Sequence, residues 1–505
     1  MRFITKYKRE ILFCLVLVIV FFLLRLLSLK QLPIFTDEAI YLRWAQIAKN
    51  DANWRFISLT DGKQPLFIWF VVGAMKFLHD PLIAGRIVSV FAGLGTVIGL
   101  FFLGREVFKN RYVGLVSSFL YVIFPFALVY DRMALYDSLV GTFIVWGLYF
   151  TFLLVRNLRL DYALIMGFVT GAAVLNKTNG FFTIYLLPFA LVLFNFKEKD
   201  TKQKLLRFFG LSLLVVVMTY GFYSILRLSP FFYIINEKNH IFFYPLSEWI
   251  KNPLAFFLPN ISAFNDWTLR YVGLPLLLTA GSAFFLSKSY LREKLLLLAW
   301  FIIPYIGFAL DGKTIYPRYI FPMTLSLLPL VAFSLVTIAK KFKGWKLYLV
   351  MVLVISYSLV TDFLILYNFP KSPVPNSDKS QYLTGWPSGQ GVSEVTDYLA
   401  ERVKKNRIYV GTEGTFGLMP YSLEIAFNNN PNVTVKGFWP INKLPPQELL
   451  DAAKISETYV LFYEECPDCE SIGVAPSTWP VEKVLQFKKI EPGVYLTLYK
   501  VHSAK

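Results

Sequence analysis

The feature that most constrains this chain is a succession of long apolar stretches separated by short basic loops. Residues 11–29, 82–104, 112–130 and 138–156 are the first four stretches. As α-helices they reach about the 30 Å thickness of a bilayer's hydrocarbon core, and a helix satisfies its own backbone polar groups inside lipid. Only 17% of the residues are charged, against about a quarter in ordinary soluble proteins. The sequence therefore predicts a polytopic membrane protein.

Further apolar stretches follow, so that about eleven spans are expected in all. They lie at 161–176, 179–196, 206–226, 269–287, 294–310, 317–338 and 346–366. Residues 65–78 are also apolar, but about 14 residues reach only about 21 Å as a helix. If they crossed, the next basic loop and every later one would lie outside. We therefore expect an interfacial helix there, with Trp69 as one of its anchors.

The basic residues also set the expected orientation. Arg2, Lys6, Lys8 and Arg9 precede the first span, which places the N-terminus in the cytoplasm by the positive-inside rule. The inner loops are then net basic, and an odd number of spans leaves the C-terminal part outside. We expect a multi-pass protein of the plasma membrane. The formal net charge of +18 is topology information on this interpretation. No basic face or motif for nucleic acid lies apart from the membrane loops, so no nucleic-acid partner is expected.

The composition changes near Tyr367, where prolines and glycines indicate a linker rather than a span. A helix-like pattern at 392–404 and strand-like patterns at 407–411, 433–437, 458–463, 484–487 and 494–499 follow. This mixture predicts a small α/β domain. The expected fold is mainly α: a transmembrane helical bundle over 1–366, a linker over 367–393 and an extracytoplasmic α/β domain over 394–505. The strands carry no Gly-x-Gly-x-x-Gly, so no nucleotide site is expected there.

Four groups of charged and aromatic residues lie at the outer ends of the predicted spans. They are Asp37-Glu38 with Tyr41 and Arg43; Asp131-Arg132 with Asp137; Asn176-Lys177; and Asp311 and Lys313 with Tyr316, Arg318 and Tyr319. Any one group can simply mark the water boundary, because charged side chains at span ends commonly reach to the interface. Together, carboxylates and cations at one face of an apolar protein indicate a polar pocket at the outer leaflet.

Glycosyl transfer from a polyprenyl phosphate needs both signs of charge in one place. A base must take the proton of the acceptor hydroxyl, and cations must hold the phosphate that departs. A carboxylate beside the sugar also favours the positive charge that develops at the anomeric carbon. Lysine and arginine both bind phosphate well. The outer groups therefore predict a membrane glycosyltransferase in which Asp37 is the base.

The order and spacing of the motifs resemble the C-type membrane glycosyltransferases, and within them the protein mannosyltransferase and aminoarabinose transferase relatives of family 39. The motifs are Asp37-Glu38-Ala39-Ile40-Tyr41, Gln64-Pro65-Leu66-Phe67-Ile68-Trp69, Tyr136-Asp137, Asn176-Lys177 and Lys313-x-x-Tyr316-Pro317-Arg318-Tyr319. The resemblance covers about residues 10 to 340, and the C-terminal tail resembles that of the aminoarabinose transferases. It implies an inverting transfer, at the outer face, of one sugar from a polyprenyl-phosphate sugar to a hydroxyl-bearing acceptor, with membrane lipid as a further partner.

The resemblance also implies roles for single residues. Asp37 matches the base, Glu38 the neighbouring carboxylate on the acceptor side, and Asp137 the second acidic position. The cations expected near the donor phosphate are Lys313 and Arg318, with weaker matches at Lys177 and Lys63. Relatives often have Lys-Pro where this chain has Gln64-Pro65, and Lys63 stands one position earlier. The residues expected to line the substrate pocket are Tyr41, Asp131, Arg132, Tyr316, Tyr319 and His240.

No metal site is assigned; a divalent metal stays open as a cofactor, but the sequence does not indicate one. His240 lies in a loop that resembles one in some relatives, but it has no second ligand nearby in the sequence. Cys466-Pro-Asp-Cys469 lacks the second pair that a zinc site needs, so a loop disulfide or two free thiols are expected. No other cofactor is expected.

Three alternatives stay open on the sequence. The chain could be a transporter or lipid flippase without glycosyl transfer, although such proteins place charges or broken helices near the bilayer midplane. It could be a lipid-linked assembly factor whose outer domain only binds. The loop that contains Trp386 is either a plain linker or a lid that selects the acceptor. The sequence does not identify the sugar or the acceptor.

Overall fold

The computed structural model describes residues 8–465 and 478–503 of the chain. They form two compact units, each assembled from segments that are separate in the sequence. The first unit comprises Met1–Leu29, Asn53–Phe70 and Arg86–Pro375. The second comprises Lys30–Ala52, Val71–Gly85 and Asn376–Lys505. The boundaries that the sequence suggested at residues 366 and 393 stay a prediction.

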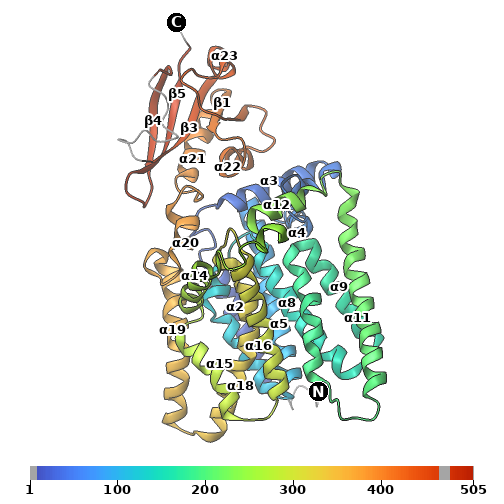
Figure 1. Ribbon diagram of the computed structural model, residues 1–505. Coiled ribbons are helices and arrows are strands. Elements are labelled where there is room, and N and C mark those ends of the chain that lie inside the picture. Colours follow the sequence, from blue (N-terminus) through green and yellow to red (C-terminus); the bar gives the residue numbers. More distant parts are fainter. Residues whose placement is uncertain (1–7, 466–477, 504–505) are drawn as a thin grey trace. The chain divides into compact units, whose positions relative to one another are not determined.

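The first unit is a bundle of helices (Figure 1). Its helices are α2 (Lys8–Leu26), α6 (Arg111–Val122), α7 (Pro125–Tyr130), α8 (Asp137–Asn157), α9 (Leu160–Asn176), α10 (Phe182–Leu186), α11 (Thr201–Ser224), α12 (Ile234–Phe242), α13 (Leu246–Trp249), α14 (Phe257–Tyr271), α15 (Leu274–Leu286), α16 (Leu291–Asp311), α17 (Phe321–Thr324), α18 (Leu328–Lys341) and α19 (Trp345–Tyr367). Two more, α4 (Leu66–Ala74) and α5 (Pro81–Phe108), contain residues of both units.

Six helical segments in the described part of the chain are long and apolar enough to cross a bilayer, or up to seven if one bent pair is counted. The six are Pro81–Phe108, Asp137–Asn157, Thr201–Leu228, Leu291–Asp311, Phe321–Lys341 and Trp345–Tyr367. Each coincides with a predicted span, and the predicted class of a helical bundle with a C-terminal α/β domain is confirmed. The expected number of about eleven spans is reached only by counting helices that are shorter, broken or more charged.

Two predicted spans are broken in the structure. The stretch at 112–130 divides into α6 and α7, and Pro125 begins α7, where its missing N–H costs no helical hydrogen bond. The stretch at 269–287 is the end of α14 plus α15, and these two helices meet at an angle of 98°. Gly273 lies between them with φ +80°, a backbone conformation that residues with a Cβ rarely adopt. The first predicted span is α2, which carries Lys8, Glu10 and Arg25.

The apolar stretch at 65–78 contains a helix of only nine residues, α4. Nine residues span about 14 Å as an α-helix, less than half of a hydrocarbon core. The indole N–H of Trp69 on α4 donates to the carbonyl of Arg55 at 2.7 Å. The predicted short helix is therefore present, and its interfacial position stays a prediction.

The second unit contains a five-stranded sheet with the order β2-β1-β3-β5-β4 (Figure 1). The strands are β1 (Ile408–Glu413), β2 (Val433–Phe438), β3 (Glu457–Glu465), β4 (Val481–Lys488) and β5 (Val494–Val501). β1 pairs in parallel with β2 and β3, whereas β5 pairs antiparallel with β3 and β4. The helices of this unit are α3 (Thr36–Asn50), α20 (Asn376–Lys379), α21 (Val392–Val403), α22 (Leu418–Ala426) and α23 (Gln447–Ile455). All five predicted strands and the helix at 392–404 are found at their expected places.

Alternate residues of β1 and β3 face two separate cores, because successive side chains of a strand point to opposite faces of the sheet. Ile408, Val410, Tyr459 and Leu461 pack with residues of α21 and α22. Tyr409, Val460 and Phe462 pack with Leu449 and Ala452 of α23. Helices therefore cover both faces of the sheet.

Helix α3 lies far from the sheet in sequence but belongs to the same unit. Its Arg43 guanidinium donates to the Glu424 carboxylate at 2.6 Å and to the Asn428 side chain at 2.9 Å. The backbone N–H and hydroxyl of Thr36 both donate to the carbonyl of Pro387 at 2.9 Å. These contacts attach α3 to α22 and to the loop before α21.

An Arg43→Ala variant is expected to loosen α3 from α22. Hydrogen bonds to charged groups contribute roughly 1.5–3 kcal/mol, so amide exchange over residues 36–50 should quicken by roughly 10- to 100-fold. Hydrogen exchange measured by mass spectrometry on the full chain checks this. Arg407→Ala, at an exposed position of the same unit, is the matched control and should leave that exchange unchanged. Equal protection in both variants would contradict the anchoring role of Arg43.

Candidate functional site

Three of the sequence motifs meet in the first unit. The hydroxyl of Tyr136, at the N-terminus of α8, donates to the carbonyl of Gln64 at 2.9 Å. The side-chain amide of Gln64 donates to the hydroxyl of Thr178 at 2.8 Å. The side-chain amide of Asn176, the last residue of α9, donates to the carbonyl of Tyr136 at 3.2 Å. The segments 64–65, 136–137 and 176–178 are therefore joined by hydrogen bonds.

An ion pair forms at this meeting point. Lys177 Nζ lies 2.7 Å from Asp137 Oδ1. Asp137 is the first residue of α8, and Lys177 follows α9 in an extended conformation that directs the chain away from the helix. The Asp137 side chain is 5% exposed and that of Lys177 is 23% exposed, so the carboxylate is buried and the lysine side chain is partly open to water.

Aromatic rings connect this ion pair to further cations. Lys177 Nζ lies 5.1 Å from the centre of the Tyr319 ring, and Lys63 Nζ lies 5.1 Å from that of Phe242. The Arg318 guanidinium lies 4.8 Å from the centre of the Tyr316 ring. Cations over aromatic faces gain roughly 0.5–2 kcal/mol, depending on their solvation.

The three rings themselves are neighbours. The centre of the Tyr319 ring lies 5.7 Å from that of Tyr316 and 6.4 Å from that of Phe242. We call the side chains of Lys63, Lys177 and Arg318, together with these three rings, the cation cluster. The cation cluster carries three positive charges, and the Asp137 carboxylate pairs with one of them, that of Lys177.

Lys313 and His240 lie at the edge of this arrangement. The backbone N–H of Lys313 donates to the carbonyl of Phe242 at 2.8 Å, while its Nζ lies 5.8 Å from the centre of the Tyr244 ring. His240 is an exposed residue of α12, and its Nε2 lies 3.5 Å from the side-chain nitrogen of Asn236. The structure thus brings the backbone of Lys313 to the cation cluster and places the His240 side chain beside another residue of its own helix.

Asp131 and Arg132 are buried and bonded to protein groups. Asp131 lies 3.3 Å from the Arg25 guanidinium and accepts hydrogen bonds from the hydroxyls of Tyr121 at 3.0 Å and Ser138 at 2.9 Å. Arg132 donates to the carbonyls of Leu27 and Ser28 at 2.7 and 2.8 Å. Both residues tie the turn between α7 and α8 to the α2 segment, and their place in a substrate pocket stays a prediction.

Asp37, Glu38 and Tyr41 belong to the second unit, on α3. The Glu38 carboxylate is fully buried and accepts a hydrogen bond from the backbone N–H of Phe35 at 3.0 Å, which caps the helix N-terminus. Tyr41 is buried with its ring 5.9 Å from that of Trp44. Asp37 is half-buried in the first turn, a place where carboxylates interact favourably with the helix dipole.

No three histidine, cysteine, aspartate or glutamate side chains converge on a metal-sized site within the described ranges. Cys466 and Cys469 lie outside the described residues. The motif Tyr136-Asp137 and the loop His240-Ile241-Phe242-Phe243 each contain an aromatic residue, Tyr136 and Phe242, to which the sequence gave no role. The Tyr136 hydroxyl joins two motifs, and the Phe242 ring carries Lys63. The only signal for either was an aromatic residue inside a motif.

Comparisons with known proteins give one family match and a shared fold. The family described as dolichyl-phosphate-mannose-protein mannosyltransferase matches residues 62–223, which include Lys63, Asp137 and Lys177. A search of the curated proteins finds no significant match.

Solved structures share the fold over nearly the whole chain. The crystal structure of ArnT from Cupriavidus metallidurans in the apo state is similar with a TM-score of 0.58 and 13% sequence identity, over 98% of each chain. The same protein bound to undecaprenyl phosphate has a TM-score of 0.56 at 13% identity over 98% of each chain. The oligosaccharyltransferase AglB from Archaeoglobus fulgidus, in complex with an inhibitory peptide and a dolichol-phosphate, has a TM-score of 0.52 at 13% identity. This match covers 91% of our chain and 69% of AglB.

Proposed function

We propose that this protein is a glycosyltransferase dependent on a polyprenyl-phosphate sugar. Two findings support this: the chain has the fold of the GT-C membrane glycosyltransferases, and it matches the mannosyltransferase family over residues 62–223. It moves one sugar, with inversion, to an acceptor hydroxyl at the outer membrane face. ArnT holds undecaprenyl phosphate and AglB holds a dolichol-phosphate in their solved structures, and a donor of that lipid class suits this chain.

The cation cluster is the observation that carries this proposal. Its three positive charges, one of them paired with Asp137, suit a phosphate that gains negative charge as the sugar leaves. The fork of Arg318 can hold two phosphate oxygens, and Lys177 and Lys63 act as point charges. Lys313, whose backbone adjoins Phe242, is assigned to the same phosphate. Asp137 serves chiefly to hold Lys177 Nζ in place.

The reaction is a single displacement. The acceptor oxygen attacks the anomeric carbon from the face opposite the phosphate, and its proton passes to the Asp37 carboxylate. The bond between the anomeric carbon and the phosphate oxygen breaks, and the bonding electrons leave with polyprenyl phosphate. The cations stabilise that extra negative charge in the transition state more than in the bound donor, which is what accelerates the step. Glu38 keeps the first turn of α3 in shape for Asp37.

The test uses the full chain in lipid nanodiscs with polyprenyl-phosphate sugars and an acceptor panel. The sugar on any polyprenyl lipid that purifies with the protein, identified by mass spectrometry, sets the first donor. The expected product has the opposite anomeric configuration to the donor. Movement of the intact lipid across a vesicle membrane without cleavage of the sugar would overturn the proposal in favour of a flippase.

A Lys177→Ala variant is expected to lower kcat/KM for the donor by roughly 10- to 100-fold, because a hydrogen bond to a charged group contributes roughly 1.5–3 kcal/mol. Lys177→Arg should recover part of this loss because it keeps the charge. Initial rates against donor concentration measure the effect. The exposed Lys251→Ala is the matched control. A kcat/KM for the donor that stays at the wild-type value in Lys177→Ala would remove Lys177 from the phosphate site.

A further inference from the structure

A cavity of about 440 Å³ lies within the C-terminal part of the second unit. It opens between the loop before α21, the end of β1, the start of α22, the segment after β2 and the inner strands β3 and β5. Small-molecule sites in proteins have volumes of about 300–1,000 Å³ and are mostly apolar with a few polar groups. The cavity has this character.

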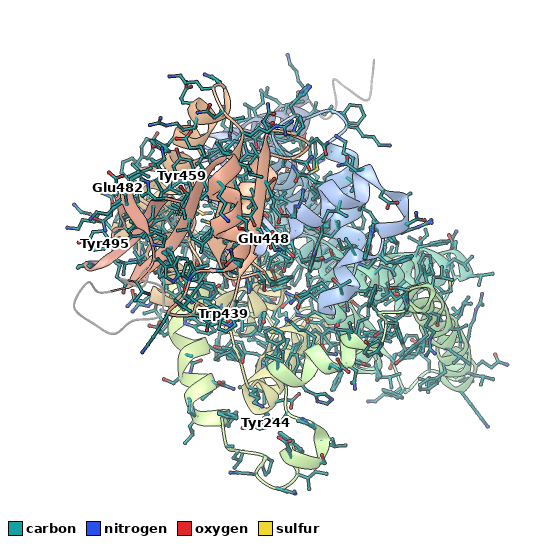
Figure 2. All side chains as sticks on the ribbon, turned by 90° about the horizontal axis from the view of Figure 1, so that it is seen from above. Tyr244, Trp439, Glu448, Tyr459, Glu482 and Tyr495 are labelled. Carbon is teal, nitrogen blue, oxygen red and sulfur yellow. The ribbon has the colours of Figure 1, made fainter. Side chains whose placement is uncertain are left out.

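Three aromatic side chains at the cavity are exposed to solvent. The exposed fractions are 59% for Trp386, 56% for Trp439 and 47% for Phe416. Within the described part of residues 376–505, every large aromatic side chain that is exposed lines this one cavity. Trp439, labelled in Figure 2, directly follows β2. Exposed apolar groups gathered at one place commonly mark a binding site.

Neither tryptophan uses its indole N–H within the protein. Across the ranges that the structure describes, no hydrogen bond joins the Nε1 of Trp386 or Trp439 to a protein acceptor. Tryptophan is favoured where one side of a contact is apolar and the other is polar. The two rings can therefore offer both a flat apolar face and a donor to the same ligand.

Polar groups stand between the aromatic ones. The Glu413 carboxylate accepts a hydrogen bond from the backbone N–H of Tyr463 at 3.2 Å, and an ionised carboxylate has about four acceptor positions in all. The side-chain oxygen of Gln390 accepts from the backbone N–H of Ile490 at 3.1 Å, which leaves its NH₂ group as a donor. The cavity therefore offers both an acceptor and a donor beside the rings.

Lys489 fixes the wall of the cavity rather than offering a free charge. Its side chain is buried, with 3% of the residue exposed, and its Nζ donates to the carbonyl of Ser388 at 2.8 Å. The same Nζ lies 4.3 Å from the centre of the Tyr463 ring. The Lys489 ammonium already donates to a protein carbonyl, and the Glu413 carboxylate would repel an anionic ligand in this cavity. The charge pattern therefore disfavours phosphates and other anions.

A sugar ring matches this combination of groups. The C–H face of a pyranose is apolar and packs on an aromatic ring, while its hydroxyls at the edge can donate to a carboxylate and accept from an amide. An acyl chain would cover the rings as well, but it would take water away from the Glu413 carboxylate and the Gln390 amide without offering either of them a hydrogen bond, which is costly. A neutral sugar is therefore favoured over a lipid tail.

We propose that this cavity binds a sugar ring of the acceptor, so that the acceptor is a glycan or a glycolipid. This inference rests on the proposed transferase function and adds to it a recognition site for the acceptor in the C-terminal domain. Trp386 and Trp439 supply the stacking faces, and Glu413 and Gln390 bond the hydroxyls.

The first experiment measures binding without any donor. The full chain in nanodiscs free of sugar-based detergent is titrated with trisaccharides of hexose, N-acetylhexosamine, hexosamine and pentose, and binding is followed by saturation-transfer NMR. At least one trisaccharide is expected to bind with a Kd of millimolar or below. Octyl glycosides of the same sugars show whether the acceptor sugar belongs to a lipid. A lower Kd for the octyl glycoside than for the trisaccharide indicates a glycolipid, whereas equal Kd values indicate a glycan on another carrier. No binding by any sugar, or equal binding by decanoate, would overturn the proposal.

The variants place the sugar in the cavity. Trp386→Ala and Trp439→Ala are each expected to weaken the Kd roughly tenfold, with partial recovery in the corresponding Phe variants. Trp345→Ala removes an exposed tryptophan of the first unit that does not line the cavity, and it should bind as the wild type does. Wild-type binding in both cavity variants would place the sugar elsewhere and overturn the proposal.

The acceptor KM and the kcat of the cavity variants test this inference independently of the proposed function. In the transfer assay the two cavity variants should raise KM for the acceptor about as much as they raise Kd, with kcat within roughly twofold of the wild type. If transfer proceeds and the acceptor KM does not change, the cavity inference fails while the proposed function stands. If no transfer occurs with any donor but the trisaccharide still binds in the cavity, the transferase proposal fails and the sugar site remains.

Discussion

An Asp37→Asn variant is expected to lose sugar transfer by roughly 10²- to 10⁴-fold in kcat, because asparagine keeps the size of the side chain but cannot accept the acceptor's proton. The loss should appear in kcat at saturating donor and acceptor, because Asp37 takes the proton in the transition state and does not contribute to the binding of either substrate. Single-turnover assays with a labelled donor measure it.

Two further substitutions on the same helix control for structural damage. Asp51→Asn changes an exposed carboxylate at the end of α3 and should keep full activity. Glu38→Gln keeps an oxygen that can accept from Phe35 N–H, so it should preserve the fold and reduce transfer less than Asp37→Asn does. Wild-type kcat in Asp37→Asn would remove the base from the mechanism.

The second large effect is expected on stability. Asp131→Leu removes a buried carboxylate that pairs with Arg25 and accepts from Tyr121 and Ser138. Breaking a buried pair by removing one partner costs roughly 3–5 kcal/mol, because the other charge stays buried without compensation. The purified variant should therefore lose its fold at a clearly lower temperature, followed by intrinsic fluorescence in detergent.

Two comparisons make this result specific. Arg25→Met combined with Asp131→Leu should recover much of the loss, because no uncompensated charge remains. Asp161→Asn breaks a pair with Arg159 whose side chains are 49% and 60% exposed, and it should change stability little. A double variant as unstable as the sum of its single variants would show that the pair is not the source of the effect.

Much of the fold could be predicted because its signals are local. Hydropathy located the long helices, and runs of β-branched and aromatic residues located the five strands. The breaks between α6 and α7 and between α14 and α15 were missed, because an apolar run looks alike whether its helix is straight or bent by 98°. The strand order β2-β1-β3-β5-β4 depends on contacts between distant residues, which no local pattern encodes.

The candidate site was predictable residue by residue but not as an arrangement. Lys177 and Asp137 could each be selected as charges at the ends of apolar runs, whereas their pairing joins positions 40 residues apart. Asp131 looked similar in the sequence, yet its partner Arg25 lies 106 residues earlier inside another helix. Glu38 stands next to Asp37 and caps their own helix instead of facing outward. Sequence alone cannot separate a charge that meets substrate from one already used by the fold.

The attachment of α3 to the C-terminal domain has a consequence for how the protein is made. Arg43 bonds to Asn428, which follows it by 385 positions. At about 5–20 residues per second, roughly 20–80 s of translation separate the two. Throughout that interval the helix that carries Asp37 lacks its contacts with the C-terminal domain. A ribosome that stops early therefore releases a chain in which α3 lacks the anchors that Arg43 and Thr36 provide.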